Sequence, residues 1–235
     1  MIRVKTSGRL GNILFQNIGV SILARKFDYK TEIINQYALT ENDKNILGLK
    51  LYSGNNIKSD LKKIGDDNVL DILKLDKIDY GLDFEGYFEL KDFVIDYKKD
   101  IIEHFSLKYD YISNDEVFVH VRLGDIYYYH KLAKLEYYIK ALDSITFTKG
   151  YISSDTIDHP FVLELVKRYN LIIYNDSPVN TINFAKNFNN LVLSQGTFSW
   201  FIGFLSKANN ILYPNNYNRW HGDIFVYDEW QGISV

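Results

Sequence analysis

Residues 116–125, EVFVHVRLGD, indicate most clearly how this chain folds. The apolar run from Val117 to Val121 predicts a buried strand, which the turn Leu123-Gly124-Asp125 brings to an end. Strand-like and helix-like segments then alternate as far as Pro214, which predicts a parallel sheet with right-handed crossovers. The expected strands are residues 149–154, 171–174, 191–194 and 210–213, and the expected helices are residues 135–142, 161–169, 181–188 and 197–207.

The N-terminal half begins in the same way. Residues 2–6 predict a strand, SGRLGN (residues 7–12) predicts a glycine turn, and residues 31–34 predict a second strand. Between them we expect a helix with one apolar face at helical spacing, formed by Leu14, Phe15, Ile18, Ile22 and Leu23. Residues 40–80 predict short helices and loops, and residues 93–105 predict a helix. We therefore expect an α/β fold with two Rossmann-like domains, residues 1–110 and residues 111–235.

Composition restricts the classes of function. The 235 residues are 46% hydrophobic and 24% charged, as is usual for a globular protein. The 27 basic and 30 acidic residues give a net charge of −3, so there is no basic surface field and a nucleic-acid partner is not expected. The absence of cysteine excludes disulfides, thiolate catalysis and Cys-ligated zinc. No apolar run approaches the roughly 18 residues that span a bilayer, and we expect a cytoplasmic protein.

The end of the 116–121 strand is the first candidate site. His120 and Arg122 are two residues apart, so they share a face of the strand. Arg122 lies where an open α/β sheet presents ligand groups, and its guanidinium can donate two hydrogen bonds to a phosphate. Asp125 can accept a proton. The alternative is an ordinary ion pair between Arg122 and Asp125, and this segment alone does not separate the two interpretations.

Two other strand ends carry small polar residues. In SQGTFSW, residues 194–200, the hydroxyls of Thr197 and Ser199 precede a helix whose free N–H groups can bind an anion. The alternative is a plain Ser/Thr helix cap. In ISSD, residues 152–155, Asp155 can bind a ribose or a base edge, or it can cap the next helix. No D-x-D triplet occurs and the five His residues are scattered, so no metal site is expected.

The turn GRLGN, residues 8–12, is a further candidate. It differs from the G-x-G-x-x-G dinucleotide fingerprint, and no P-loop occurs in the chain. By itself this turn indicates only a close approach of the backbone to another group.

Taken in order, these segments resemble glycosyltransferase family 11, the α-1,2-fucosyltransferases. The resemblance extends over nearly the whole chain, although Ile13, Ile126 and Phe201 depart from the family pattern. The segments that carry it are GRLGNILFQ (8–16), GYFELKDF (86–93), HVRLGDI (120–126), HKLAKLEYYIKAL (130–142), ISSD (152–155), GTFSWFIGFL (196–205) and DEWQGI (228–233).

This resemblance implies a GT-B arrangement, in which two Rossmann-like domains face each other and the C-terminal domain binds the donor. It implies transfer of L-fucose from GDP-fucose to a glycan or glycolipid hydroxyl, O2 of a galactoside in this family, with inversion and without a metal or other cofactor. Any membrane-bound acceptor would be reached from outside the bilayer. The implied donor-binding residues are His120, Arg122, Ser153, Asp155, Thr197, Phe198 and Ser199. Those implied for the cleft and acceptor are Arg9, Gly11 and Asn12.

The same resemblance implies that Arg122 acts in catalysis and that Asp125, or else His130, is the base. Two alternatives remain open. One is a related transferase that uses another GDP- or UDP-linked deoxysugar. The other is a glycan- or nucleotide-binding protein that keeps the cleft but has no activity.

Overall fold

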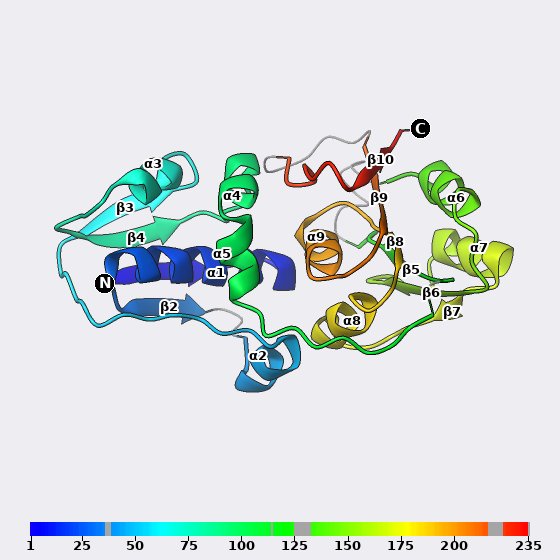
Figure 1. Cartoon of the computed structure of the whole chain (residues 1–235), viewed down its shortest axis with the longest axis horizontal. Helices are drawn as coiled ribbons and strands as arrows, with labels where there is room; N and C mark the ends of the chain where they lie inside the picture. Colours follow the sequence, from blue (N-terminus) through cyan, green and yellow to red (C-terminus); the bar gives the residue numbers. More distant parts are fainter. Residues whose placement is uncertain (36–38, 114, 125–132, 216–222, 235) are drawn as a thin grey trace. The chain divides into compact units, whose positions relative to one another are not determined.

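The computed structural model describes residues 1–35, 39–113, 115–124, 133–215 and 223–234. The chain forms two compact units (Figure 1). The first contains Met1–Leu107 together with Asp223 and Ile224, and the second contains the described residues from Lys108 to Asn215 and from Phe225 to Ser234. The chain therefore passes between units at Leu107–Lys108, where the sequence suggests a division after residue 110.

The first unit is built on a four-stranded parallel sheet in the order β2-β1-β4-β3. Helix α1 lies along this sheet (Figure 1). The strands are β1 (Ile2–Thr6), β2 (Thr31–Asn35), β3 (Leu61–Gly65) and β4 (Gly81–Glu85). The helices are α1 (Leu10–Phe27), α2 (Glu41–Leu47), α3 (Val69–Lys74), α4 (Lys91–Asp96) and α5 (Lys98–Glu103).

Helix α1 is buried on nearly all sides, which corrects the expectation of a single apolar face. Its polar residues are buried as well, and each of them has a hydrogen-bond partner. Asn17 Nδ2 donates to the carbonyl of Ile13 at 2.8 Å, and Ser21 Oγ accepts the Tyr52 N–H at 2.6 Å. The helix is therefore central to this unit.

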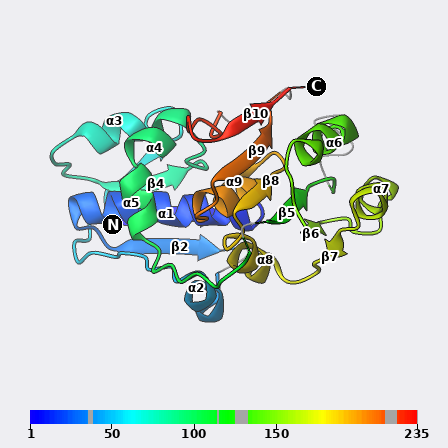
Figure 2. The ribbon, with the colours of Figure 1, turned by 45° about the vertical axis from the view of Figure 1, so that its right-hand side comes forward.

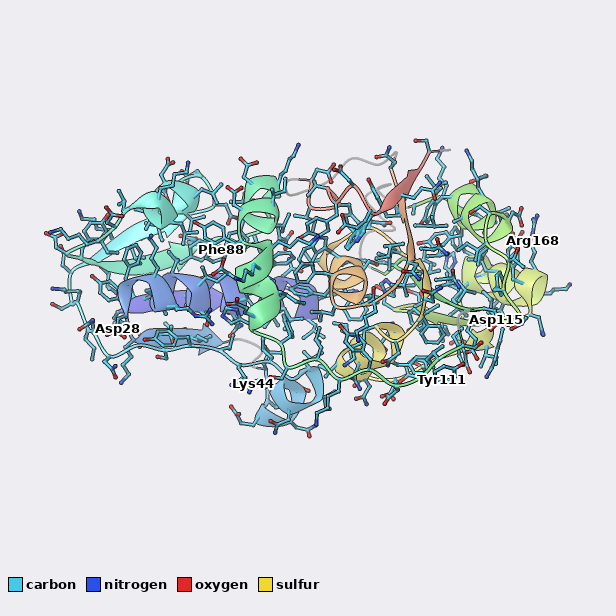
Figure 3. The ribbon with its side chains drawn as sticks, viewed as in Figure 1. Asp28, Lys44, Phe88, Tyr111, Asp115 and Arg168 are labelled. Carbon is cyan, nitrogen blue, oxygen red and sulfur yellow. The ribbon has the colours of Figure 1, made fainter. Side chains whose placement is uncertain are left out.

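Two other expectations for the first half need correction. Residues 40–80 contain strand β3 as well as helices, and β4 follows at Gly81. Charged side chains on one face of these strands conceal their apolar alternation. The single helix expected over 93–105 is two short helices, α4 and α5, which meet at Tyr97. The turn before α4 contains Phe88 (Figure 3), which has a left-handed backbone with a φ of 59°.

The second unit has a six-stranded sheet in the order β10-β9-β8-β5-β6-β7, and every pair of neighbours is parallel. The strands are β5 (Glu116–Val121), β6 (Lys149–Ser154), β7 (Ile172–Ile173), β8 (Asn190–Val192), β9 (Asn210–Pro214) and β10 (Gln231–Ile233). The helices are α6 (Leu135–Asp143), α7 (Pro160–Tyr169), α8 (Pro178–Ala185) and α9 (Thr197–Phe204). The predicted parallel α/β arrangement is confirmed for both units, although α8 begins earlier and α9 ends earlier than expected.

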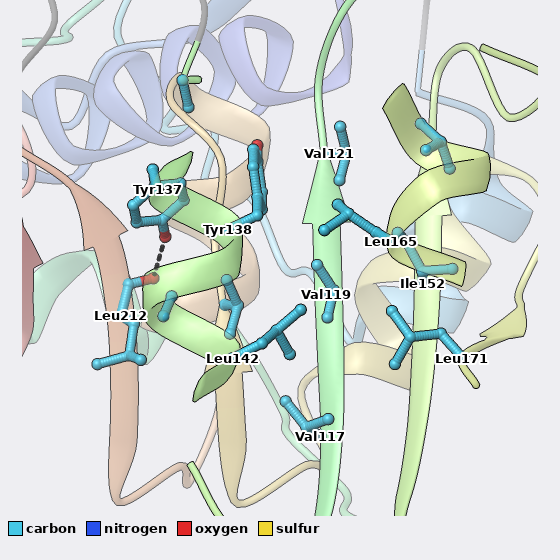
Figure 4. Packing of buried hydrophobic residues seen from close by; sticks show 14 of the residues in the cluster. Val117, Val119, Val121, Tyr137, Tyr138, Leu142, Ile152, Leu165, Leu171 and Leu212 are labelled. Carbon is cyan, nitrogen blue, oxygen red and sulfur yellow. Dashed lines mark hydrogen bonds between the residues drawn. The ribbon is translucent and has the colours of Figure 1, made fainter. Parts of the chain in front are cut away.

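Strand β5 lies between two layers of helices. Val117, Val119 and Val121 are fully buried and belong to a cluster that includes side chains of α6 and α7 (Figure 4). The intervening residues point to the other face, where Phe118 packs against Phe184 of α8 and the His120 ring against Phe198 of α9. Figures 1 and 2 show α6 and α7 on one side of the strands and α8 and α9 on the other.

The strand order creates a crevice at one place in this sheet. From β5 the chain moves outward through β6 and β7, returns beside β5 as β8, and moves outward in the opposite direction through β9 and β10. Open α/β sheets bind ligands at such a reversal, outside the carboxyl ends of the strands. The topology therefore directs attention to the segments that follow β5 and β8.

No helix in the described parts of the chain is long and apolar enough to cross a membrane.

Tyr137 of α6 tests how strongly this sheet depends on one buried hydroxyl. Its oxygen donates to the carbonyls of Leu193 at 2.7 Å and Leu212 at 3.0 Å (Figure 4). Tyr137→Phe should lower the free energy of unfolding by about 1–2 kcal/mol, because a buried carbonyl loses its donor. Urea unfolding measures this, with Tyr111→Phe as the control, because the Tyr111 side chain is 92% exposed. Equal stability of the two variants would contradict the prediction.

Candidate functional site

The Ser199 hydroxyl connects three elements at the reversal between β5 and β8. Its Oγ accepts the backbone N–H of Ser194 at 3.1 Å and forms a 2.6 Å hydrogen bond with Nδ1 of His120. Ser199 lies on α9, Ser194 follows β8, and His120 lies on β5. The Ser199 side chain is fully buried. Its hydroxyl therefore holds the crevice together and is occupied by protein groups.

His120 is held neutral at this position. Its ring is buried against Phe198, with the two ring centroids 4.9 Å apart. Burial lowers the pKa of His120 from 6.5 to about 4; the carboxylate of Asp155 opposes this lowering, and the positive charge of Arg122 adds to it. A neutral imidazole can donate and accept hydrogen bonds but contributes no positive charge. Positive charge in the crevice must therefore come from other groups.

Arg122 follows β5 directly and lies against the segment after β8. Its backbone N–H donates to Oγ of Ser194 at 3.2 Å. Its Nη1 lies 3.4 Å from the point that a Cβ on Gly196 would occupy. The guanidinium of the half-buried Arg122 is thus beside the residue at which α9 begins.

The start of α9 has no side-chain cap. Its N-cap residue is Gly196, with a φ of 94°, a conformation that glycine adopts at little cost. The interpretation of residues 194–200 as a plain Ser/Thr cap is therefore wrong. The first N–H groups of a helix have no acceptor within the helix, and together with the helix dipole they attract anions. The guanidinium and the helix start thus concentrate positive potential at one place.

Asp155 fixes the loop that carries Arg122. Its Oδ1 accepts the backbone N–H groups of Leu123 at 2.9 Å and Gly124 at 3.2 Å. It does not cap the following helix, because the N-cap of α7 is His159. Ser153 is buried and pairs with His120 in the register of β5 and β6. Both residues therefore lie at the crevice, and Asp155 has a structural role there.

Gln195 belongs to the same cluster, although the sequence gave no sign of its role. Its Oε1 accepts the backbone N–H of Ala133 at 3.1 Å and the Ser194 hydroxyl proton at 3.0 Å. The side chain is buried. It fixes the chain immediately before α6 against the segment after β8. Only the Ser-Gln-Gly triplet before a helix could have suggested this residue, and that pattern is common.

The structure thus brings together His120, Arg122, Ser153, Asp155, Thr197, Phe198 and Ser199, all of them in the second unit. Arg9, Gly11 and Asn12 belong to the first unit, where Arg9 is the N-cap residue of α1. The other two lie in the first turn of that helix, and the Asn12 side chain packs over Gly8, whose φ is 86°. Asp125 and His130, the two candidate bases, lie outside the described residues.

Among the described residues, no group of three or more His, Cys, Asp or Glu side chains could hold a metal ion. Comparison of the chain with models of known protein families gives no match, and a search of curated proteins gives no significant match. The site must therefore be interpreted from its own chemistry.

The buried His120 predicts a pH-dependent stability. Its pKa in the folded protein, about 4, lies below the ordinary value of 6.5, so the unfolded chain binds more protons between these values. The free energy of unfolding should therefore decrease by about 3 kcal/mol as the pH falls from 6.5 to 4. His104, whose pKa burial also lowers, contributes in the same direction.

Urea titrations at several pH values measure this effect. His120→Asn should have a shallower dependence than the wild type, whereas His159→Asn, at a half-buried surface position, should retain the wild-type dependence. Identical pH dependence in the wild type and His120→Asn would show that His120 is not the titrating group.

Proposed function

We propose that this protein is an inverting glycosyltransferase that moves L-fucose from GDP-fucose to a hydroxyl of a glycan, O2 of a galactoside. The observation that carries the proposal is the Arg122 guanidinium beside the uncapped start of α9, in the crevice between β5 and β8. The motifs that resemble the α-1,2-fucosyltransferases supply the choice of donor and acceptor.

The chemistry of glycosyl transfer requires a site of this kind. The bond from the sugar to its leaving group breaks through a transition state that resembles an oxocarbenium ion. Negative charge then accumulates on the departing diphosphate. Fixed positive groups stabilise that charge more in the transition state than in the ground state, and this difference accelerates the reaction. In the proposal, Arg122 and the N–H groups at the start of α9 have this role.

The support around Arg122 is already in place without a ligand. Its backbone is hydrogen-bonded to Ser194, and its loop is held by Asp155. The start of α9 is held through Ser199. Electrostatic catalysis depends on groups that need not reorganise when the charge develops. Ordering of the site would thus cost little when the nucleotide binds.

The remaining roles follow from position and from the resemblance. His120, neutral and buried beside Arg122, is a hydrogen-bonding group for the nucleotide. Asp125 is proposed as the base that accepts the proton of the acceptor hydroxyl, with His130 as the second choice. The hydroxyl oxygen then attacks C1 of fucose from the side opposite the diphosphate, which inverts the configuration.

Arg122→Ala tests the proposal directly. Transfer should fall about 10²–10³-fold, because one charge-stabilising contact is lost. Arg122→Lys should be intermediate, since an ammonium keeps the charge without the planar fork. The assay incubates GDP-fucose and other GDP- and UDP-deoxysugars with β-galactosides, then determines product mass and linkage. Arg168→Ala is the matched control, because Arg168 is a half-exposed arginine at the end of α7.

Near-normal transfer by Arg122→Ala would overturn the proposed role of this residue. Wild-type protein that binds GDP in calorimetry, yet neither hydrolyses nor transfers any of these donors, would instead be a binding protein without activity.

The proposal also predicts the effect of chelation. Positive charge for the diphosphate comes here from a guanidinium and a helix start, so EDTA should change the transfer rate less than about twofold. The measurement is initial rate with and without EDTA, followed by addition of Mg²⁺ or Mn²⁺. A complete loss of activity that either metal restores would contradict the metal-independent mechanism.

A further inference from the structure

The first unit contains a cavity of about 600 Å³ outside the carboxyl ends of its strands. Ser7 follows β1, Lys63 lies on β3, and Glu85 and Tyr87 lie at the end of β4 and just beyond it. Its lining comes entirely from this unit and includes none of Arg9, Gly11 and Asn12. A hollow at this end of a parallel sheet is a preferred place for a ligand.

A buried glutamine fixes two sides of the cavity. Gln16 Oε1 accepts the backbone N–H of Ser7 at 3.0 Å, and its Nε2 donates to the carbonyl of Gly86 at 2.9 Å. The Ser7 hydroxyl donates to the Tyr87 hydroxyl oxygen at 3.2 Å. The turns after β1 and β4 are therefore held at a fixed separation, with two hydroxyl groups between them.

The turn after β4 is held in a strained conformation. Phe88 has a φ of 59°, a left-handed conformation that costs a bulky residue free energy. Asp66 maintains it by accepting the backbone N–H groups of Tyr87 and Phe88, each at 2.8 Å. The Phe88 ring stacks on Phe84 with centroids 4.0 Å apart, and it fills the space above Gly19. Strain that several contacts maintain in this way is typical of ligand sites.

Charged groups at the cavity remain available to a ligand. Within the described part of the chain, Lys5, Lys63 and Glu85 have neither a hydrogen bond nor a close ion pair, and all three are exposed. Asp83, which also lines the cavity, is already paired with Arg3 through two hydrogen bonds of 3.0 and 2.8 Å. The cavity thus offers donors and acceptors without a large excess of either charge.

We infer that this cavity binds the acceptor saccharide, an inference that rests on the proposed function. Sugar hydroxyls donate and accept hydrogen bonds, which suits a lining of ammonium, carboxylate and hydroxyl groups. The half-buried ring of Tyr87 adds an apolar surface for the C–H face of a sugar. Lys63 and Glu85 are the specificity-determining pair, and Ser7 and Tyr87 are the hydroxyl contacts.

Two binding measurements on the same full-length variants test the inference. Saccharide binding is followed by ligand-observed NMR with methyl β-galactoside and lactose, and GDP binding by calorimetry. Lys63→Ala/Glu85→Ala should weaken saccharide binding at least about tenfold, because charged hydrogen bonds are lost, and should leave GDP binding unchanged. Arg122→Ala should have the reverse effect. The control Lys50→Ala/Glu32→Ala removes the same two charges from exposed positions of this unit outside the cavity.

Glu85→Gln, which retains size and one acceptor, guards against loss of folding and should give a smaller decrease than the double variant. The inference is overturned if wild-type protein binds GDP but neither saccharide, or if both double variants bind saccharide equally well. If the wild type binds saccharide in a Glu85-dependent manner but does not bind GDP, the cavity assignment stands and the proposed function fails.

Discussion

The hydroxyl of Ser199 is the contact on which the second unit depends most. It lies where β5, β8 and α9 meet, and it satisfies both a backbone N–H and an imidazole nitrogen that would otherwise be buried without partners. Its position fixes the start of α9 relative to His120, and hence relative to Arg122. A side chain in the first turn of a helix usually caps that helix, but here it joins the helix to the sheet. Gly196 occupies the N-cap position in its place.

The two units solve a similar problem with similar residues. Each has a helix that follows a strand through a glycine with positive φ, Gly8 at 86° and Gly196 at 94°. Each also has a buried glutamine whose amide connects separate segments at the carboxyl ends of the strands, Gln16 in one unit and Gln195 in the other. An amide can accept and donate in the same plane, so it fixes the separation of two turns without adding charge. Each unit can thus keep a polar hollow open without support from a ligand.

The sequence predicted the second unit well because its strands are short apolar runs between clear helices, with β5 buried on both faces. It predicted β3 and β4 poorly, because residues such as Lys63 and Asp83 give these strands a polar face. The shared location of His120 and Arg122 followed from strand periodicity. The roles of Ser199 and Asp155 did not, because a hydroxyl and a carboxylate can satisfy backbone groups on distant segments, and spacing along the chain does not record such contacts.

Phe88 and Gly19 illustrate how far such a contact can constrain a protein. A Cβ on residue 19 would lie 2.4 Å from the Phe88 ring, and the ring can occupy that space only because its own backbone is left-handed. Neither position can therefore change alone without loss of packing. Among diverged sequences that share this fold, the two positions should vary together: a larger residue at 19 should accompany a smaller residue, or glycine, at 88. Such covariation would record the geometry of the β4 turn across evolution.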